Sequence, residues 1–167
     1  SLESNKGHAP LDALRVLETL SSHTAAMTGA QTDRMTRDDG WRLLSIGRHL
    51  ERLGFLADAL ARAIETGAVF EAGGFEAVVA LFDSTITFHA QYQLRRDMPA
   101  LLDLLVIDHD NPRALAWVAQ TLRGRIAKIE EAAGADARPL VQGIPMPPPL
   151  TVLCAQDNGH AALRAYL

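Results

Sequence analysis

The side chains best suited to chemistry in this sequence are three charged groups close together, Arg48, Glu51 and Arg52. A guanidinium group can bind two oxygens of a carboxylate or phosphate at once, and a carboxylate can act as an acid or base. On a helix, Leu44 and Phe55 share the flank of this trio, which indicates partial burial. Because charged groups that lose water need partners, the question is which other side chains meet them.

Polar residues from two other stretches are the candidate partners of this trio. Two interpretations of the whole set remain open, and the spacing favours the first. In the structural interpretation, Glu51 is the counter-charge of a buried network that fixes the register of the helices. In the binding interpretation, Arg48, Arg52 and Arg95 line a groove for an anion. The predicted binding or buried polar network consists of Arg48, Glu51, Arg52, Ser84, Arg95, Asn111 and Arg113.

Other kinds of catalytic site find little support in the spacing. A carboxylate-bridged two-metal bundle needs Glu-x-x-His on two helices, and the nearest match here is Asp157-x-x-His160. Cys154 has no patterned histidine partner, and neither a Gly-x-Ser-x-Gly motif nor a phosphate-binding glycine loop occurs. We therefore predict no metal, no cofactor and no catalytic residue, and we favour a domain that is not an enzyme on its own.

The composition is typical of a globular domain. The chain has 167 residues, of which 48% are hydrophobic and 22% charged. A net charge of -4 argues against binding nucleic acid or an anionic membrane by bulk charge. No apolar run approaches the roughly 18 residues of a membrane span. The single cysteine suits a reducing, cytoplasmic setting, and the missing initiator methionine suggests a fragment of a longer chain.

The elements that must position the candidate residues are helices. Apolar residues recur three and four positions apart in five stretches, and no alternating strand pattern occurs. These stretches are 10–28, 40–66, 75–96, 99–107 and 112–133. We place the ends of the first and second helices at Gly29 and Gly67, and a break before the third at Gly73-Gly74. The fold class is therefore all-α, an antiparallel bundle of about five helices.

The third and fifth predicted helices carry the partner residues. The apolar stripe of the third runs from Phe75 to Ile86 and His89, and its second half is rich in Ser, Thr and Gln. Serine and threonine have a lower helix propensity than most residues, because their hydroxyl groups compete for backbone hydrogen bonds. This composition therefore favours a buried polar network over an exposed helix face. Asn111 is a good N-cap for the fifth helix, with Pro112 in the first turn.

Both ends of the chain differ from the helical middle. Residues 1–9 form a disordered or tag-derived N-terminus, and residues 10–133 form the bundle. Residues 134–167 contain a proline-rich segment followed by one short helix, a partly irregular C-terminal tail.

Three blocks in the same order resemble the alpha-E domain family of bacterial all-helical domains. Residues 36–52 resemble its Glu-Arg helix, residues 83–87 its polar third helix, and residues 102–113 its leucine-rich segment followed by Asn-Pro-Arg. The resemblance covers roughly residues 10–133. Phe88, His89 and Ala114 depart from the family pattern. Full-length relatives have two tandem halves, so this chain resembles one half of them.

The resemblance implies partners more than chemistry. Such domains occur fused to, or encoded beside, circularly permuted ATP-grasp proteins that look like amide or peptide ligases. The leading hypothesis is a non-catalytic accessory domain that docks such a ligase, in the same chain or a separate one, or holds its peptide substrate. One alternative is an enzyme or anion-binding domain that uses Glu51 with Arg48, Arg52 and Arg95. Another is a purely structural bundle that forms a homodimer.

Overall fold

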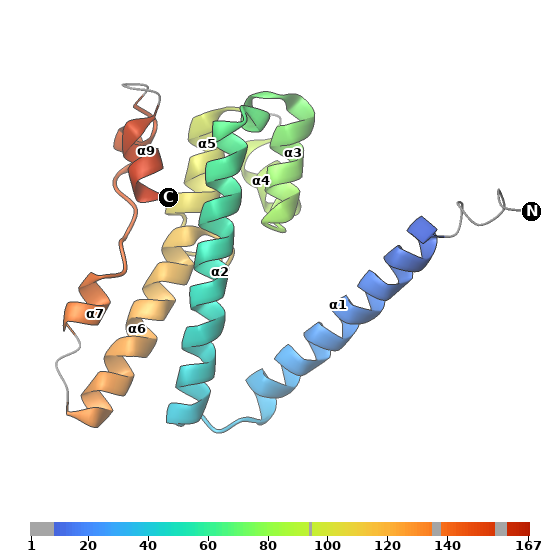
Figure 1. The fold of residues 1–167 in the computed structure, drawn as a ribbon. Helices are drawn as coiled ribbons and strands as arrows, with labels where there is room; N and C mark the ends of the chain where they lie inside the picture. The colour runs from blue at the N-terminus through green and yellow to red at the C-terminus, as the bar shows by residue number, and fades with distance from the viewer. Residues whose placement is uncertain (1–8, 94, 135–137, 156–159) are drawn as a thin grey trace, which may run out of the picture. The chain divides into compact units, whose positions relative to one another are not determined.

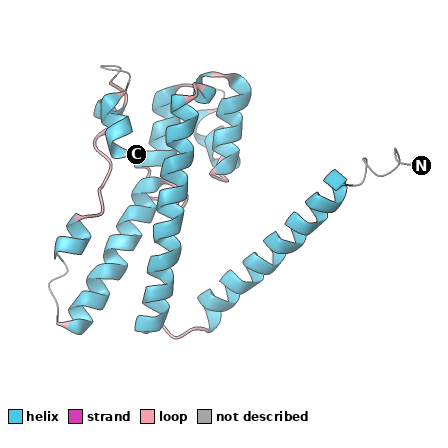
Figure 2. Cartoon of the chain, viewed as in Figure 1, coloured by secondary structure: helices cyan, strands magenta, loops and turns pink. Residues whose placement is uncertain are grey.

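The protein is described by a computed structural model that covers residues 9–93, 95–134, 138–155 and 160–167. Every regular element in these ranges is helical, which confirms the all-α prediction (Figure 2). The chain divides into two compact units, one ending at Trp41 and the other running from Arg42 to Leu167. None of the described helices is long and apolar enough to cross a membrane.

The first unit consists mainly of the helix α1 (Ala9–Arg34). This helix continues past Gly29, where we expected it to end, because a single glycine costs a helix only about 1 kcal/mol relative to alanine. In the following turn the Asp38 carboxylate accepts a hydrogen bond of 2.9 Å from the Trp41 amide. The Arg37 guanidinium lies 4.1 Å from the centre of the Trp41 ring. These contacts define the start of α2 (Asp39–Glu65).

The second unit is built on α2 and α6 (Leu115–Ala133), which pack side by side and antiparallel (Figure 1). Its core is apolar and gathers residues from most of the elements between and after these two helices. In chain order those elements are the short 3-10 helix η1 (Ala68–Phe70), α3 (Ala72–Leu81), α4 (Thr85–Tyr92), α5 (Met98–Leu102) and the π-helical segment η2 (Asp103–Ile107).

The single third helix that we predicted for residues 75–96 is instead two helices, α3 and α4. Asp83 has a positive φ of 49°, which an α-helix does not accommodate, so the chain turns there. The buried Ser84 hydroxyl donates to the Phe82 carbonyl, 3.0 Å away, in place of a helical bond. The turn redirects the predicted apolar stripe, and the side chain of Ile86 is 87% exposed.

The break that we predicted at Gly73-Gly74 is also wrong, since both glycines lie within the first turn of α3. A side chain at Gly74 would collide with the backbone carbonyl of Ala68. Glycine is therefore needed here because η1 and α3 approach closely, and not because the helix ends.

The leucine-rich α5 and η2 are buried, and an asparagine holds the turn that follows them. The Asn111 amide donates to the Leu104 carbonyl at 3.0 Å, and its oxygen accepts from the Arg113 amide at 3.1 Å. Asn111 therefore ties the π-helical segment to the next turn. We predicted that α6 starts at Pro112, but the helix begins at Leu115, after this turn.

The C-terminal segment packs on the core through short helices. They are α7 (Arg138–Gln142), α8 (Leu150–Leu153) and α9 (Ala161–Tyr166). Leu153 and Leu163 are fully buried, and a guanidinium nitrogen of Arg123 in α6 donates to the Ile144 carbonyl at 2.9 Å. The intervening proline run, residues 147–149, has no regular structure, in line with the irregular tail that we predicted.

Candidate functional site

An arginine in the turn before α6 forms an ion pair with a carboxylate in the turn between α3 and α4, and an arginine of α2 lies within the electrostatic field of this pair. Arg113 donates from Nε at 3.0 Å and from Nη2 at 2.7 Å to Oδ2 of Asp83. Asp83 lies in the left-handed turn, and the Arg113 backbone is held by Asn111. Two irregular segments, 30 residues apart in sequence, therefore join through one ion pair.

Arg52 lies in the electrostatic field of this pair. Burial lowers the pKa of Arg52, and the positive charges of Arg113 and Arg48 lower it further, whereas the Asp83 carboxylate raises it. Within the described residues no hydrogen bond or ion pair holds the Arg52 guanidinium. We call Arg52, Arg113 and Asp83 the arginine cluster. It opposes two guanidinium groups with one carboxylate.

The other predicted site residues lie around or away from the arginine cluster. Glu51 is exposed, and no described residue forms a hydrogen bond or an ion pair with it. Arg95 forms its own ion pair with Asp97, 2.7 Å away. Ser84 is buried next to Asp83 and bonds only to its own turn. Asn111 positions the Arg113 backbone and does not enter the cluster.

The sequence reasoning did not single out Asp83 as the carboxylate that meets Arg113. One signal was available, because Asp83 opens the second of the three blocks that resemble the alpha-E family. It was missed because the residues were read as the interior of one helix. The side chain of an aspartate in a turn contacts different residues from one on a helix face. Aspartate is also among the residues that tolerate a positive φ.

A second polar contact joins α4 to the π-helical segment. The Tyr92 hydroxyl donates to the Asp103 carboxylate at 2.5 Å, and burial together with this carboxylate raises the pKa of Tyr92. In the connection between α4 and α5, Arg96 donates to Glu76 of α3 at 2.8 Å. The first contact joins α4 to η2 and the second joins this connection to α3, so we regard both as structural.

The described residues are better suited to bind an anion than to bind a metal ion or to provide a reactive thiolate. No group of three or more His, Cys, Asp or Glu side chains in the described ranges could hold a metal ion. Most of the Asp157-x-x-His160 motif lies outside these ranges. Burial raises the pKa of Cys154, which disfavours the reactive thiolate. Guanidinium groups such as Arg52 remain able to bind a carboxylate or phosphate.

Comparison with known proteins places this geometry in a family. Residues 2–143 match the model of Alpha-E, described as a predicted alpha-helical domain with a conserved ER motif. The only Glu-Arg dipeptide in the sequence is Glu51-Arg52. Its arginine belongs to the arginine cluster.

Relatives of this chain are much longer proteins. An uncharacterized protein of Mycobacterium bovis is 25% identical over 131 residues, and two uncharacterized proteins of Mycobacterium tuberculosis match to the same degree. The match covers 75% of this chain and 15% of each relative, so the chain spans only a small part of their length. No solved structure matches.

Proposed function

The chain belongs to the alpha-E family, and we propose that it is a non-catalytic helical interaction domain acting with an ATP-grasp-type amide or peptide ligase. It docks the ligase or holds the ligase's peptide substrate. The observation that supports an interaction role is the exposed apolar face of α1. The identity of the partner rests on the resemblance described above.

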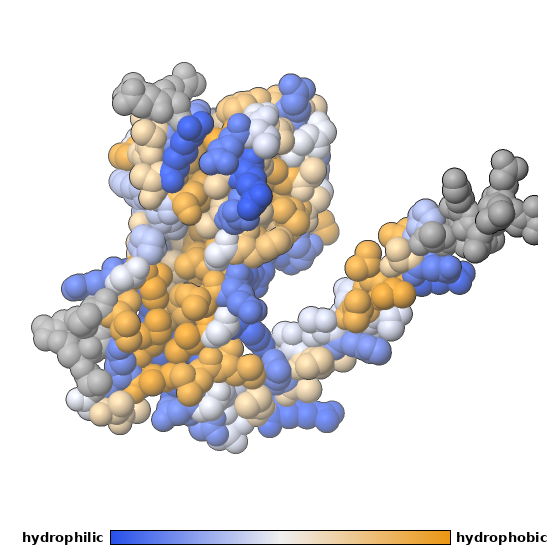
Figure 3. Space-filling view, viewed as in Figure 1, coloured by the Kyte–Doolittle hydropathy of each residue, from blue (hydrophilic) through white to orange (hydrophobic). Residues whose placement is uncertain are grey.

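The apolar residues of α1 are not buried within their own compact unit. Leu11, Leu14, Leu17 and Leu20 are each more than half exposed, and Figure 3 shows apolar side chains gathered on the N-terminal half of this helix. A helix isolated in water is marginally stable, and most helices in proteins gain stability by burying such a face. An amphipathic helix laid into a groove of another protein is a common recognition mode.

The length of the relatives is compatible with a catalytic partner in the same chain. Since the matched region is 15% of each relative, most of their sequence lies outside this domain. A ligase encoded separately fits the same role, because the apolar face of α1 can bind it in trans. In both cases the domain supplies binding and the ligase supplies the chemistry.

The docking role is tested by charging the apolar face of α1. The variant Leu14→Lys/Leu17→Lys should bind the purified ATP-grasp-type ligase of the same genome at least about tenfold more weakly, because two apolar contacts are replaced by charges that must be desolvated. The matched control Thr19→Lys/Ala26→Lys adds the same charges to another side of α1. It should bind within about twofold of the unmodified chain.

Two outcomes would contradict this proposal. One is equal binding by both variants. The other is a stable homodimer in sedimentation velocity that only Leu14→Lys/Leu17→Lys dissociates, while the ligase does not bind. That second result would favour the structural, dimerising alternative.

Anion binding at the arginine cluster is a second candidate, favoured by the excess of guanidinium groups over carboxylates there. Arg113, with its partner Asp83, acts on Arg52 electrostatically, whereas Arg95 pairs with Asp97 and does not enter the cluster. An acidic peptide or a substrate carboxylate suits this cluster, because a guanidinium group binds two carboxylate oxygens at once. Binding here would complement docking through α1, since it engages a polar part of the partner.

Titration with inorganic phosphate and with N-acetyl-dialanine, followed by NMR of the arginine side chains, tests this candidate. Arg52→Gln and Arg113→Gln should each abolish the response. The control Arg62→Gln, on the same helix but paired with Asp58, should leave it unchanged. Asp83→Asn should tighten binding, because it removes the competing carboxylate and asparagine tolerates the positive φ. A response that survives Arg52→Gln would contradict the site.

A further inference from the structure

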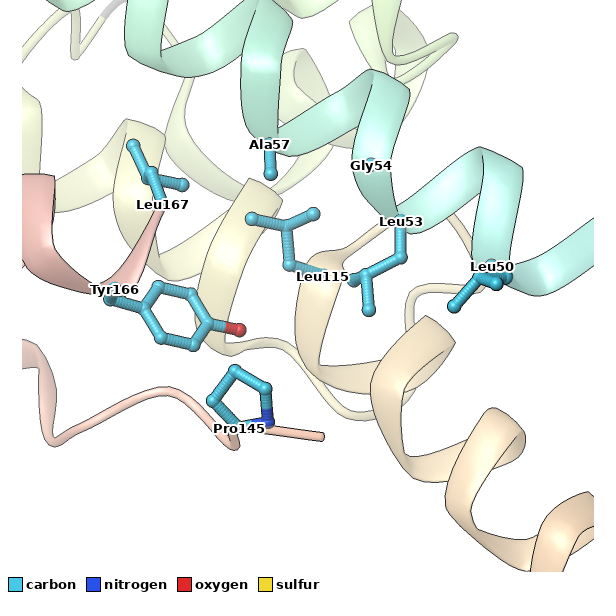
Figure 4. A pocket seen from close by; sticks show the side chains of 8 residues that line it. All are labelled: Leu50, Leu53, Gly54, Ala57, Leu115, Pro145, Tyr166 and Leu167. Atoms are coloured by element: carbon cyan, nitrogen blue, oxygen red, sulfur yellow. The ribbon is translucent and has the colours of Figure 1, made fainter. Parts of the chain in front are cut away.

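A pocket of about 370 Å³ lies between α2, the start of α6 and the C-terminal segment (Figure 4). The face of α2 contributes four of the eight lining residues, Leu115 begins α6, and Pro145 and the end of α9 close the remaining side. Figure 3 shows that apolar side chains gather over the α2 and α6 pair. The lining residues are Leu50, Leu53, Gly54, Ala57, Leu115, Pro145, Tyr166 and Leu167.

The pocket has one polar side-chain group, the Tyr166 hydroxyl, and no charged side chain in its lining. The hydroxyl points into the space between Leu115 and Pro145 (Figure 4). No described residue accepts a hydrogen bond from it. Burial raises the pKa of Tyr166 to about 12, so the hydroxyl keeps its proton at neutral pH. A single donor in apolar surroundings is suited to orient a ligand.

Gly54 is the residue that opens the pocket on the α2 side. Glycine within a helix is less favourable than alanine. A Cβ added at Gly54 would meet no atom within 4 Å, so no close approach of the backbone requires glycine there. The space that a side chain would take is part of the pocket.

We propose that this pocket binds a small neutral molecule with an apolar body and one hydrogen-bond acceptor, which receives the Tyr166 hydroxyl. The volume lies within the range of small-molecule sites, about 300–1,000 Å³. An anionic ligand would lose its hydration with no positive side chain in the lining to replace it, and the main-chain carboxylate of Leu167 in the 167-residue chain would repel it. This proposal goes beyond the docking role, since Pro145, Tyr166 and Leu167 follow the residues that match the family model.

The test uses the 167-residue chain and the neutral apolar fluorophore N-phenyl-1-naphthylamine, with 1-decanol, decane and decanoate as competitors at pH 8. The unmodified chain should bind the fluorophore, and 1-decanol should displace it at lower concentration than decanoate. Gly54→Leu fills the pocket and should weaken binding of the fluorophore at least about tenfold. The control Gly47→Leu makes the same change on the same helix, also into open space but outside the pocket, and should bind within about twofold.

The role of the hydroxyl is tested with Tyr166→Phe. This variant should bind 1-decanol about 2- to 10-fold more weakly, which corresponds to one net hydrogen bond, and should bind decane as before. Fluorophore bound to the exposed leucines of α1 would be unaffected by Gly54→Leu. Unchanged binding in Gly54→Leu, equal losses in both glycine variants, or decanoate binding as tightly as 1-decanol would overturn the proposal.

Discussion

The leucines of α1 and those of α5 and η2 have similar composition and opposite environments. Leu11, Leu14, Leu17 and Leu20 are each more than half exposed. The second group, Leu101, Leu102, Leu104 and Leu105, is fully buried. Both sets lie on helices, so helix formation alone does not account for burial.

The difference lies in what surrounds each segment within its own compact unit. The residues of α5 and η2 belong to a core that also contains residues of α2, α3, α4 and α6. Among its described residues, 9–41, the first unit holds no second long helix. Leucine spacing therefore predicts a helix with an apolar face, and neighbouring elements decide whether that face is covered. The following predictions test this contrast, from the largest expected effect to the smallest.

The largest effect is expected from truncating one leucine of each group. Leu104→Ala should lower the free energy of unfolding by about 3 kcal/mol, because it removes buried apolar contacts and leaves a cavity. Leu17→Ala should change it by no more than about 0.5 kcal/mol, since this side chain is not buried within its own compact unit. Urea denaturation at 25 °C measures both. Similar losses in the two variants would show that α1 is covered in solution.

A smaller loss is expected when the polar anchor of the buried segment is removed. Asn111→Ala should cost about 2 kcal/mol of unfolding free energy, because the buried Leu104 carbonyl and the Arg113 amide lose their partner. The neighbouring variant Asp110→Ala, at an exposed position, is the control and should cost less than about 0.5 kcal/mol. Thermal and urea denaturation of both variants would be compared. No difference between them would argue that Asn111 is not an anchor.

Two helical glycines offer a matched pair of stabilising changes. Gly29 in α1 and Gly124 in α6 both have open space where a Cβ would lie. Gly124→Ala should raise the free energy of unfolding of the second unit by roughly 0.5–1 kcal/mol through helix propensity. Gly29→Ala should increase helix content in circular dichroism without moving the unfolding transition of the second unit. A shift of that transition by Gly29→Ala would show that α1 unfolds together with the core.

The smallest effect is a pH dependence that should come from α2 and not from α1. Burial lowers the pKa of His49, a hydrogen bond to the Ser45 carbonyl raises it, and the charges of Arg48, Arg125 and Arg52 lower it. Because the folded pKa is below the unfolded value of about 6.5, the unfolded state gains its proton first on acidification. Stability should therefore be full above pH 6.5 and should decline as the pH falls below it.

Denaturation midpoints from pH 8 to pH 5 measure this decline, and His49→Gln should reduce it. The matched control is His23→Gln, which changes an exposed histidine of α1 and should leave the decline intact. The ring of His49 also lies 5.9 Å from that of Trp117, so His49→Gln changes this packing as well as the charge. The midpoints of His49→Gln at lower pH are therefore compared with the midpoint of the same variant at pH 8. An equal decline in both variants would assign the pH dependence to other groups.

Much of the secondary structure could be predicted from local patterns, and the candidate site could not. The apolar spacing of α2 agrees with the prediction, and its limits at Asp39 and Glu65 each lie one residue before those that we predicted. The division of residues 75–96 at Asp83 was missed, because a turn within an apolar stripe is selected by packing and not by spacing. The meeting of Arg113 with Asp83 depends on that turn, so no pattern on a single helix could reveal it.

By itself, the sequence determined the all-α class, the central helix with its Glu-Arg motif, and resemblance to the alpha-E family. These follow from local periodicity and from residue order, which one chain carries in full. Only the tertiary structure decided which leucines are buried, that Arg52 and Arg113 share the field of Asp83, and that Gly54 opens a pocket beside Tyr166. These depend on distances between residues far apart in sequence, and such distances are set by how the helices pack.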